Sequence, residues 1–159
     1  NFGILHFPNP KQFLKEAFRI LRPGGNLAFT AWRAADGPSG FGIVLNALST
    51  YGSFDVGLPQ GPDFFQFSDA DYCQESLSHC GFEEIVSTSL QLVWEIEDPD
   101  DLCETIMQAT VRTATIIRHQ SKEAQSAIMS DIRTRVRAFA DRGKFSVPMP
   151  ISLCRASHP

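Results

Sequence analysis

The first 32 residues alternate between short apolar runs and one amphipathic segment, and this alternation constrains the fold more than any other feature. The apolar run at 1–7 stops at Pro8, which is typical of the end of a buried strand. Apolar side chains then recur at helical spacing over 10–21. The nearly continuous apolar run over 26–32 predicts a strand covered on both faces. A strand, a helix and a strand in this order predict a right-handed crossover in a parallel sheet, and so an α/β protein.

The predicted helix has recognisable signals at both ends. Asn9 can accept hydrogen bonds from the free N–H groups of the first turn, and Pro10 occupies the first helical position without losing a bond. Pro-Gly-Gly at 23–25 ends the helix, because proline cannot continue the hydrogen-bond ladder and glycine accepts a positive φ.

Residues 34–67 differ from their surroundings, because glycine and proline recur throughout and only 43–48 has an apolar helical pattern. A long segment with little regular structure inside a compact domain is usually functional or mobile. We give equal weight to two interpretations. The segment is either a lid over a site or a surface insertion that only packs.

Regular structure is predicted again from residue 68 onward. Residues 68–71 resemble a capping box, and the helix that they begin ends at Gly81. Apolar and polar residues alternate over 82–96, which predicts a strand with one face in water.

The last part of the chain predicts an antiparallel pair of helices at 99–141, with Ser121 capping the second helix and Gly143 ending it. A final strand over 144–156 follows. Its prolines, at 148 and 150, are expected at a bulge or loop because proline cannot donate to a sheet.

The composition is that of a folded, cytoplasmic protein. With 159 residues, 43% hydrophobic and 20% charged, the chain has the content of one domain, and we treat 1–159 as a single domain with parts 1–33, 34–67 and 68–159. The net charge of −4 argues against a protein that binds nucleic-acid backbones, and no apolar run is long enough to cross a membrane. The four cysteines lack a C-x-x-C pair, which favours free thiols in a reducing compartment.

Residues 1–10 are followed by a helix that ends in Arg-Ile-Leu-Arg-Pro-Gly-Gly at 19–25 and by the apolar run at 26–32. Together these segments resemble the small-molecule branch of the class I S-adenosylmethionine-dependent methyltransferases, which have R-x-L-x-P-G-G before their fifth strand. The segment 77–82 resembles the family's next mark, a helix that ends before Gly-Phe, and 147–150 resembles its final hairpin strand. The resemblance covers essentially the whole chain. It implies the C-terminal part of a Rossmann-like α/β sheet with flanking helices and an inserted helical pair.

The sequence also departs from this family. Its members hold S-adenosylmethionine with a glycine-rich loop after the first strand and an acidic residue at the end of the second, because glycines let the backbone approach the cofactor and a carboxylate accepts both ribose hydroxyls. No G-x-G-x-G occurs in 1–159, and Asn1, which is not an initiator methionine, matches the end of the fourth strand. We therefore expect the C-terminal part of a methyltransferase, inactive by itself and without tight cofactor binding. The alternative is a truncated, non-catalytic homologue that serves as an assembly or ligand-binding module.

The resemblance places one set of candidate site residues at the start of the chain. By position, Asn1, Phe2 and Gly3 match residues that approach the methionine end of the cofactor. His6 is a weak candidate for a general base, since imidazole titrates near neutral pH. A histidine satisfied by packing and backbone is the alternative, which we favour roughly two to one.

A second set of candidates would line the substrate pocket. Trp32 and Arg33 end the predicted strand at the edge where ligands bind in open α/β sheets. Phe64 and Phe65 are candidates for an apolar wall. Packing in the core and against the domain explains these aromatic residues equally well. We predict no metal site, because Cys73, His79 and Cys80 lack the spacing of a ligand set and no second pair completes it.

We expect a small-molecule substrate, no nucleic-acid or membrane partner, and self-association. If strands that precede 1–7 are missing, this segment is an exposed sheet edge with Ile4, Leu5 and Phe7 in water. A two-fold dimer covers such a surface most simply. The alternative is that 1–7 leaves the sheet and lies over the core as coil. The helical pair offers a second contact surface, formed by Ile106, Ile116, Ile128 and Met129.

Overall fold

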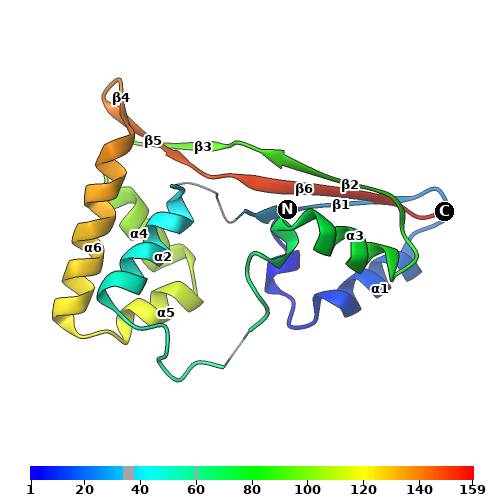
Figure 1. The fold of residues 1–159 in the computed structure, drawn as a ribbon, viewed down its shortest axis with the longest axis horizontal. Helices are drawn as coiled ribbons and strands as arrows, with labels where there is room; N and C mark the ends of the chain where they lie inside the picture. The colour runs from blue at the N-terminus through cyan, green and yellow to red at the C-terminus, as the bar shows by residue number, and fades with distance from the viewer. Residues whose placement is uncertain (34–37, 60) are drawn as a thin grey trace. The chain divides into compact units, whose positions relative to one another are not determined.

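The computed structural model describes residues 1–33, 38–59 and 61–159 (Figure 1). The described residues group into two compact units and not into the single domain that the composition predicts. The sheet unit comprises 1–33, 61–92 and 150–159, and the helical unit comprises 38–59 and 93–149. The predicted segment 34–67 is therefore divided between the two units.

The sheet unit is a mixed α/β structure. Its helices are α1 (Pro10–Ile20) and α3 (Ala70–Ser78), and its strands are β1 (Asn26–Trp32), β2 (Glu83–Leu90) and β6 (Ile151–Ser157). The strand order is β1-β6-β2, with both pairs antiparallel. Figure 1 shows α1 and α3 along the same side of this sheet. Their apolar faces pack on it in one core, which is formed by residues that include Leu14, Phe29, Phe67, Leu77 and Cys154.

The local signals in this unit act as predicted. The Asn9 side chain accepts a hydrogen bond from the Gln12 N–H at 3.1 Å, with Pro10 at the first helical position. The cap of α3 lies within the predicted 68–71, but it is Asp69 and not the Ser68 of a capping box, and it accepts from the N–H groups of Asp71 and Tyr72. Strand β1 spans 26–32 as predicted.

Two predictions for the start of the chain are wrong. Residues 1–7 contain no strand but a 3₁₀ helix, η1 (Ile4–His6), and β1 pairs with β6 in an antiparallel rather than a parallel sheet. Ile4 is 2% exposed in the core of the sheet unit. The chain thus adopts the alternative in which 1–7 leaves the sheet and lies over the core, with a 3₁₀ helix where that alternative expected coil.

The helical unit contains α2 (Gly40–Tyr51), α4 (Asp100–Ala109), α5 (Arg112–Arg118) and α6 (Lys122–Val136). It also contains η3 (Arg137–Phe139) and a small antiparallel sheet in the order β3-β5-β4, formed by Val93–Ile96, Lys144–Pro148 and Ala140–Asp141. Side chains of α2, α4, α5 and α6 share one core, which includes Leu48, Leu102, Ile117, Ile128 and Ile132. The apolar helical pattern predicted at 43–48 therefore belongs to the core of the helical unit.

The predicted helical pair at 99–141 differs from the structure at two points. Thr110 has an extended backbone (φ −113°, ψ 134°) and separates α4 from α5. Its hydroxyl accepts a hydrogen bond at 3.2 Å from the N–H of Ala114 in the first turn of α5. The helix α6 ends at Val136, and Gly143 (φ +85°) forms the turn between β4 and β5. The Thr110 side chain thus satisfies one of the free N–H groups at the start of the new helix, which favours the break at this point.

The predicted strand over 82–96 is also divided, into β2 of the sheet unit and β3 of the helical unit. The final strand is divided at the predicted place, since β5 ends at Pro148 and β6 begins at Ile151. Ile106, Ile116 and Ile128, named above as a contact surface, are at most 5% exposed and belong to the core. Among the described residues, no helix has the length and apolar character that a membrane crossing requires.

Candidate functional site

The carboxyl end of β1 collects several of the predicted site residues. The ring of Phe2 stacks on the indole of Trp32, with centroids 4.1 Å apart and planes at 12°. The Asn1 carboxamide oxygen accepts a hydrogen bond from the Thr30 hydroxyl at 3.4 Å. The structure therefore brings Asn1 and Phe2 to the strand that ends in Trp32, although the residues are about thirty positions apart in sequence.

Thr30 lies at the centre of this arrangement and was not predicted. Its hydroxyl accepts a hydrogen bond from the Phe2 N–H at 3.1 Å, and its carbonyl accepts from the same N–H at 3.1 Å. Side chains two apart on a strand share a face, so Thr30 and Trp32 both point to the side where residues 1–2 lie. This spacing is the one sequence signal that was available for Thr30.

Arg33 follows Trp32 and is held by backbone groups. Its N–H donates to the Pro150 carbonyl at 3.1 Å, and its guanidinium donates to the Ser68 carbonyl at 3.4 Å. The Ser152 hydroxyl donates to the same carbonyl at 3.3 Å. Arg33 is thus joined to the turn that precedes α3.

The two phenylalanines predicted for the pocket wall lie directly before this turn. Phe64 and Phe65 contact each other edge to face with ring centroids 5.0 Å apart, and both are half-buried. The Phe65 carbonyl accepts a hydrogen bond from the Ser68 N–H at 2.7 Å. Because Arg33 binds Ser68, one short turn connects Arg33 to the Phe64–Phe65 pair.

His6 is not part of this hydrogen-bonded arrangement. It ends η1 with an exposed side chain, and its N–H donates to the Gly3 carbonyl at 3.0 Å. A general base must reach the proton that it removes, and nothing in the described residues orients this imidazole. Its catalytic role stays a prediction.

The cysteines of the sheet unit are largely structural. Cys73 is fully buried, and its thiol donates to the Phe67 carbonyl at 3.4 Å. The neighbouring Cys154 thiol and burial both raise the pKa of Cys73.

His79 is exposed and contacts the Glu75 carbonyl through Nδ1. In the part of the chain that the structure describes, no group of three His, Cys, Asp or Glu residues is placed to hold a metal ion.

An open, acidic groove of about 560 Å³ lies on the helical unit. It is lined by Trp94, Thr105, Gln108 and the acidic residues Glu95, Glu97, Asp98, Asp101 and Glu104, together with Ile96. Asp101 accepts hydrogen bonds from the N–H groups of Glu97 and Asp98, each at 3.0 Å. These contacts place Asp101 at the start of α4, where a carboxylate stabilises the positive end of the helix.

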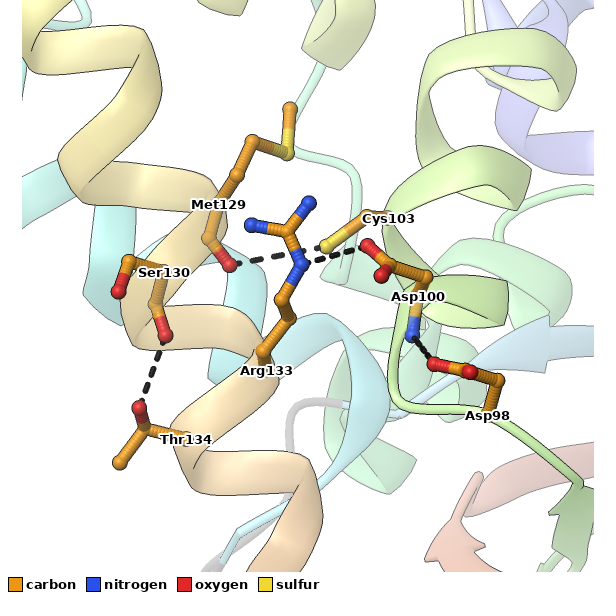
Figure 2. Close-up of polar contacts among 7 residues, drawn as sticks. All are labelled: Asp98, Asp100, Cys103, Met129, Ser130, Arg133 and Thr134. Atoms are coloured by element: carbon orange, nitrogen blue, oxygen red, sulfur yellow. Dashed lines mark hydrogen bonds and ion pairs between the residues drawn. The ribbon is translucent and has the colours of Figure 1, made fainter.

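Beside this groove, α4 and α6 are joined by polar contacts (Figure 2). Arg133 donates through Nε to the Asp100 carboxylate at 2.5 Å, and the Asp100 N–H donates to Asp98 at 2.8 Å. The buried Cys103 thiol contacts the Met129 carbonyl at 3.8 Å. Burial raises the pKa of Cys103 to about 11. At the start of α4, Asp98, Asp100 and Asp101 thus each accept a hydrogen bond from a backbone N–H group or from Arg133.

The chain is similar to several solved structures, two of which are described here. No family model matches the chain, and no curated protein matches it. A protein from Bacillus halodurans, provisionally assigned as a methyltransferase, is 20% identical, with a TM-score of 0.46 over 99% of this chain and 67% of its own. A phosphoethanolamine N-methyltransferase 2 from Haemonchus contortus, in complex with phosphomonomethylethanolamine and S-adenosylhomocysteine, is 16% identical, with a TM-score of 0.43 over 99% of this chain and 32% of its own. The chain therefore spans about two thirds of the first structure and one third of the second.

Proposed function

We propose that the chain is the C-terminal part of an S-adenosylmethionine-dependent methyltransferase that acts on a small molecule. One observation carries the proposal: residues 1–3 and the carboxyl end of β1, which the sequence motifs match to the cofactor and substrate side of that family, lie together through the Phe2–Trp32 stack. Ligands of open α/β sheets bind at such strand ends. Arg33 and the Phe64–Phe65 pair extend the same surface toward the turn before α3.

The cofactor does not fit these residues alone. The sequence has no G-x-G-x-G loop, so the main contacts to the cofactor must come from outside 1–159. We therefore assign no reaction step to this chain by itself. In a complete enzyme its residues would align the acceptor and exclude water from it, since methyl transfer needs mainly positioning. Trp32, Phe64 and Phe65 are the side chains proposed for this role.

The second proposed function is a truncated, non-catalytic homologue that serves as an assembly or ligand-binding module. The absence of the glycine-rich loop from the sequence favours it as directly as it favours a fragment. The reading frame upstream of Asn1 discriminates between the two. A G-x-G-x-G loop there supports the enzyme, and a start codon immediately before Asn1 supports the module.

Calorimetric titration with S-adenosylhomocysteine tests the proposal. We expect no measurable binding to 1–159, and binding to the same chain when it is extended by an upstream segment that carries the glycine-rich loop. Micromolar binding to 1–159 would overturn the view that the main contacts lie outside this chain. An extended chain that carries the loop and binds no S-adenosylhomocysteine would overturn the methyltransferase proposal itself.

A further inference from the structure

Phe2 has an unusual backbone conformation. Its φ is +54°, which lies in the left-handed region that bulky L-residues rarely adopt. Such residues persist only where their surroundings hold them, and they cluster at functional sites. The contacts that hold Phe2 therefore show which residues keep the segment 1–3 in place.

The Thr30 side chain provides two of these contacts. Its hydroxyl accepts from the Phe2 N–H at 3.1 Å and donates to the Asn1 carboxamide oxygen at 3.4 Å. Both the acceptor and the donor capacity of one hydroxyl are thus used on adjacent residues. Thr30 is 7% exposed, so water does not readily replace these bonds.

A third contact holds the ring of Phe2. Two positions after Thr30 on the same face of β1, Trp32 stacks on that ring at 4.1 Å. The hydroxyl holds the backbone of Phe2 while the indole holds its side chain. Without the hydroxyl, the Thr30 carbonyl is the one polar partner that the described residues leave for the Phe2 N–H. The backbone that carries the Phe2 ring is then held less firmly.

We infer that Thr30 is a positioning residue, whose buried hydroxyl keeps Phe2 in its left-handed conformation and so keeps the Phe2 ring on Trp32 at the candidate site. The role of this segment toward the cofactor rests on the proposed function, whereas the hold of Thr30 on Phe2 does not. Thr30 touches neither substrate nor cofactor in this proposal and acts only through residues 1–3.

The chain offers a matched set of variants. Thr30→Val removes the hydroxyl and keeps the shape, and Thr30→Ser keeps the hydroxyl. Thr88 on β2 stands opposite the same β6 residue, Leu153, as Thr30 does. It is exposed, so Thr88→Val controls for the loss of a threonine hydroxyl from this sheet.

The first experiment follows the two indole N–H resonances and the Phe2 amide by NMR on residues 1–159. Trp94 lies in the helical unit and serves as an internal reference. Loss of one hydrogen bond shifts the ratio of stacked to unstacked Phe2 by about fivefold. We expect Thr30→Val to move the Trp32 and Phe2 signals and to speed hydrogen exchange of the Phe2 amide. Thr30→Ser and Thr88→Val should leave them near the wild-type positions.

Two results would overturn the inference: unchanged Trp32 and Phe2 signals in Thr30→Val, or a Thr30→Ser variant that moves them equally. If Thr30→Val does not fold, Thr30→Ala provides the second test, because it also removes the hydroxyl that accepts from the Phe2 N–H and adds no bulk beside it. In that variant, an unchanged Phe2 exchange rate would contradict the inference.

The second experiment measures S-adenosylhomocysteine binding to the upstream-extended chain. We expect Thr30→Val to weaken the affinity by about fivefold, the effect of one hydrogen bond, and Thr30→Ser to retain it. If the stack is lost in Thr30→Val and affinity is unchanged, the positioning role is wrong and the proposed function stands. If the unaltered extended chain does not bind, the proposed function is wrong, and the NMR result still decides whether Thr30 holds Phe2.

Discussion

The ring of Phe18 on α1 occupies the space into which any side chain at Gly81 would project. A Cβ at Gly81 would lie 2.8 Å from Cζ of Phe18, and Gly81 has a φ of +96°. The same phenylalanine ring stacks on His158 at 4.0 Å and meets Phe82 edge to face at 5.0 Å. One aromatic side chain of α1 thus packs against the loop after α3 and the end of the chain.

Replacing Gly81 by alanine should therefore destabilise the protein for two separate reasons. A left-handed alanine costs about 1 kcal/mol or slightly more, and the clash with Phe18 adds about 1–3 kcal/mol. Gly24→Ala is the matched control, because Gly24 has φ +76° and nothing within 4 Å of the added Cβ. Urea unfolding should show a clearly larger loss for Gly81→Ala, and equal losses would contradict the packing argument.

The pKa of Cys103 predicts a loss of stability at alkaline pH. Burial raises this pKa from 9.0 to about 11 in the folded chain, so the folded state binds the thiol proton more tightly than the unfolded state. The resulting stabilisation is complete below pH 9 and is lost as the pH rises toward 11, by at most about 2–3 kcal/mol. Cys103→Ala should flatten the fall of the unfolding free energy between pH 9 and 11, when it is compared with the unaltered chain.

Cys80→Ala is the control for this pH dependence. Burial also raises the pKa of Cys80, but its side chain is only half-buried, and the difference between the folded and unfolded states is smaller. Its pH profile should remain close to that of the unaltered chain. A Cys103→Ala variant with an unchanged slope over pH 9–11 would show that the thiol titrates at its ordinary value.

Trp32 and Trp94 allow a test of which unit carries the site. In the upstream-extended chain, Trp32→Ala should weaken S-adenosylhomocysteine binding by about tenfold, since loss of a stacked aromatic contact costs about 1–1.5 kcal/mol. Trp94→Ala should lower stability and leave the affinity unchanged, because Trp94 packs on the core of the helical unit. Equal effects of the two variants on affinity would argue against the site at the end of β1.

Self-association stays a prediction, and the structure changes where its contact can lie. Ile4 is buried in the core of the sheet unit, so Ile4→Val should lower the unfolding free energy by about 0.5–1.5 kcal/mol and leave the sedimenting mass unchanged. Sedimentation equilibrium measures that mass. A clean monomer of 17.6 kDa at high micromolar concentration would refute self-association, and a dimer lost in Ile4→Val would restore the predicted interface.

Local chemistry explains the parts of the fold that were correctly predicted. Asn9, Asp69 and Ser121 each accept a hydrogen bond from an N–H group within three residues, so a short stretch of sequence contains the whole signal. The left-handed glycine at 81 likewise ends its helix by its own conformational freedom. Thr110 interrupts a helical pattern with no glycine or proline, and nothing in the sequence distinguishes it from a threonine inside a helix.

The sequence by itself determined the helices at 10–20 and 122–136 with their caps Asn9 and Ser121, the strand at 26–32 and the motifs that single out residues 1–3, Trp32 and Arg33. Only the tertiary structure decided that β1 pairs antiparallel with β6, that 1–7 buries Ile4 without forming a strand, and that Thr30 joins Asn1 and Phe2. The reason is distance along the chain. A cap is satisfied within one turn, whereas β1 finds its partner more than a hundred residues later. Several apolar segments satisfy such a strand equally well until the whole core is packed.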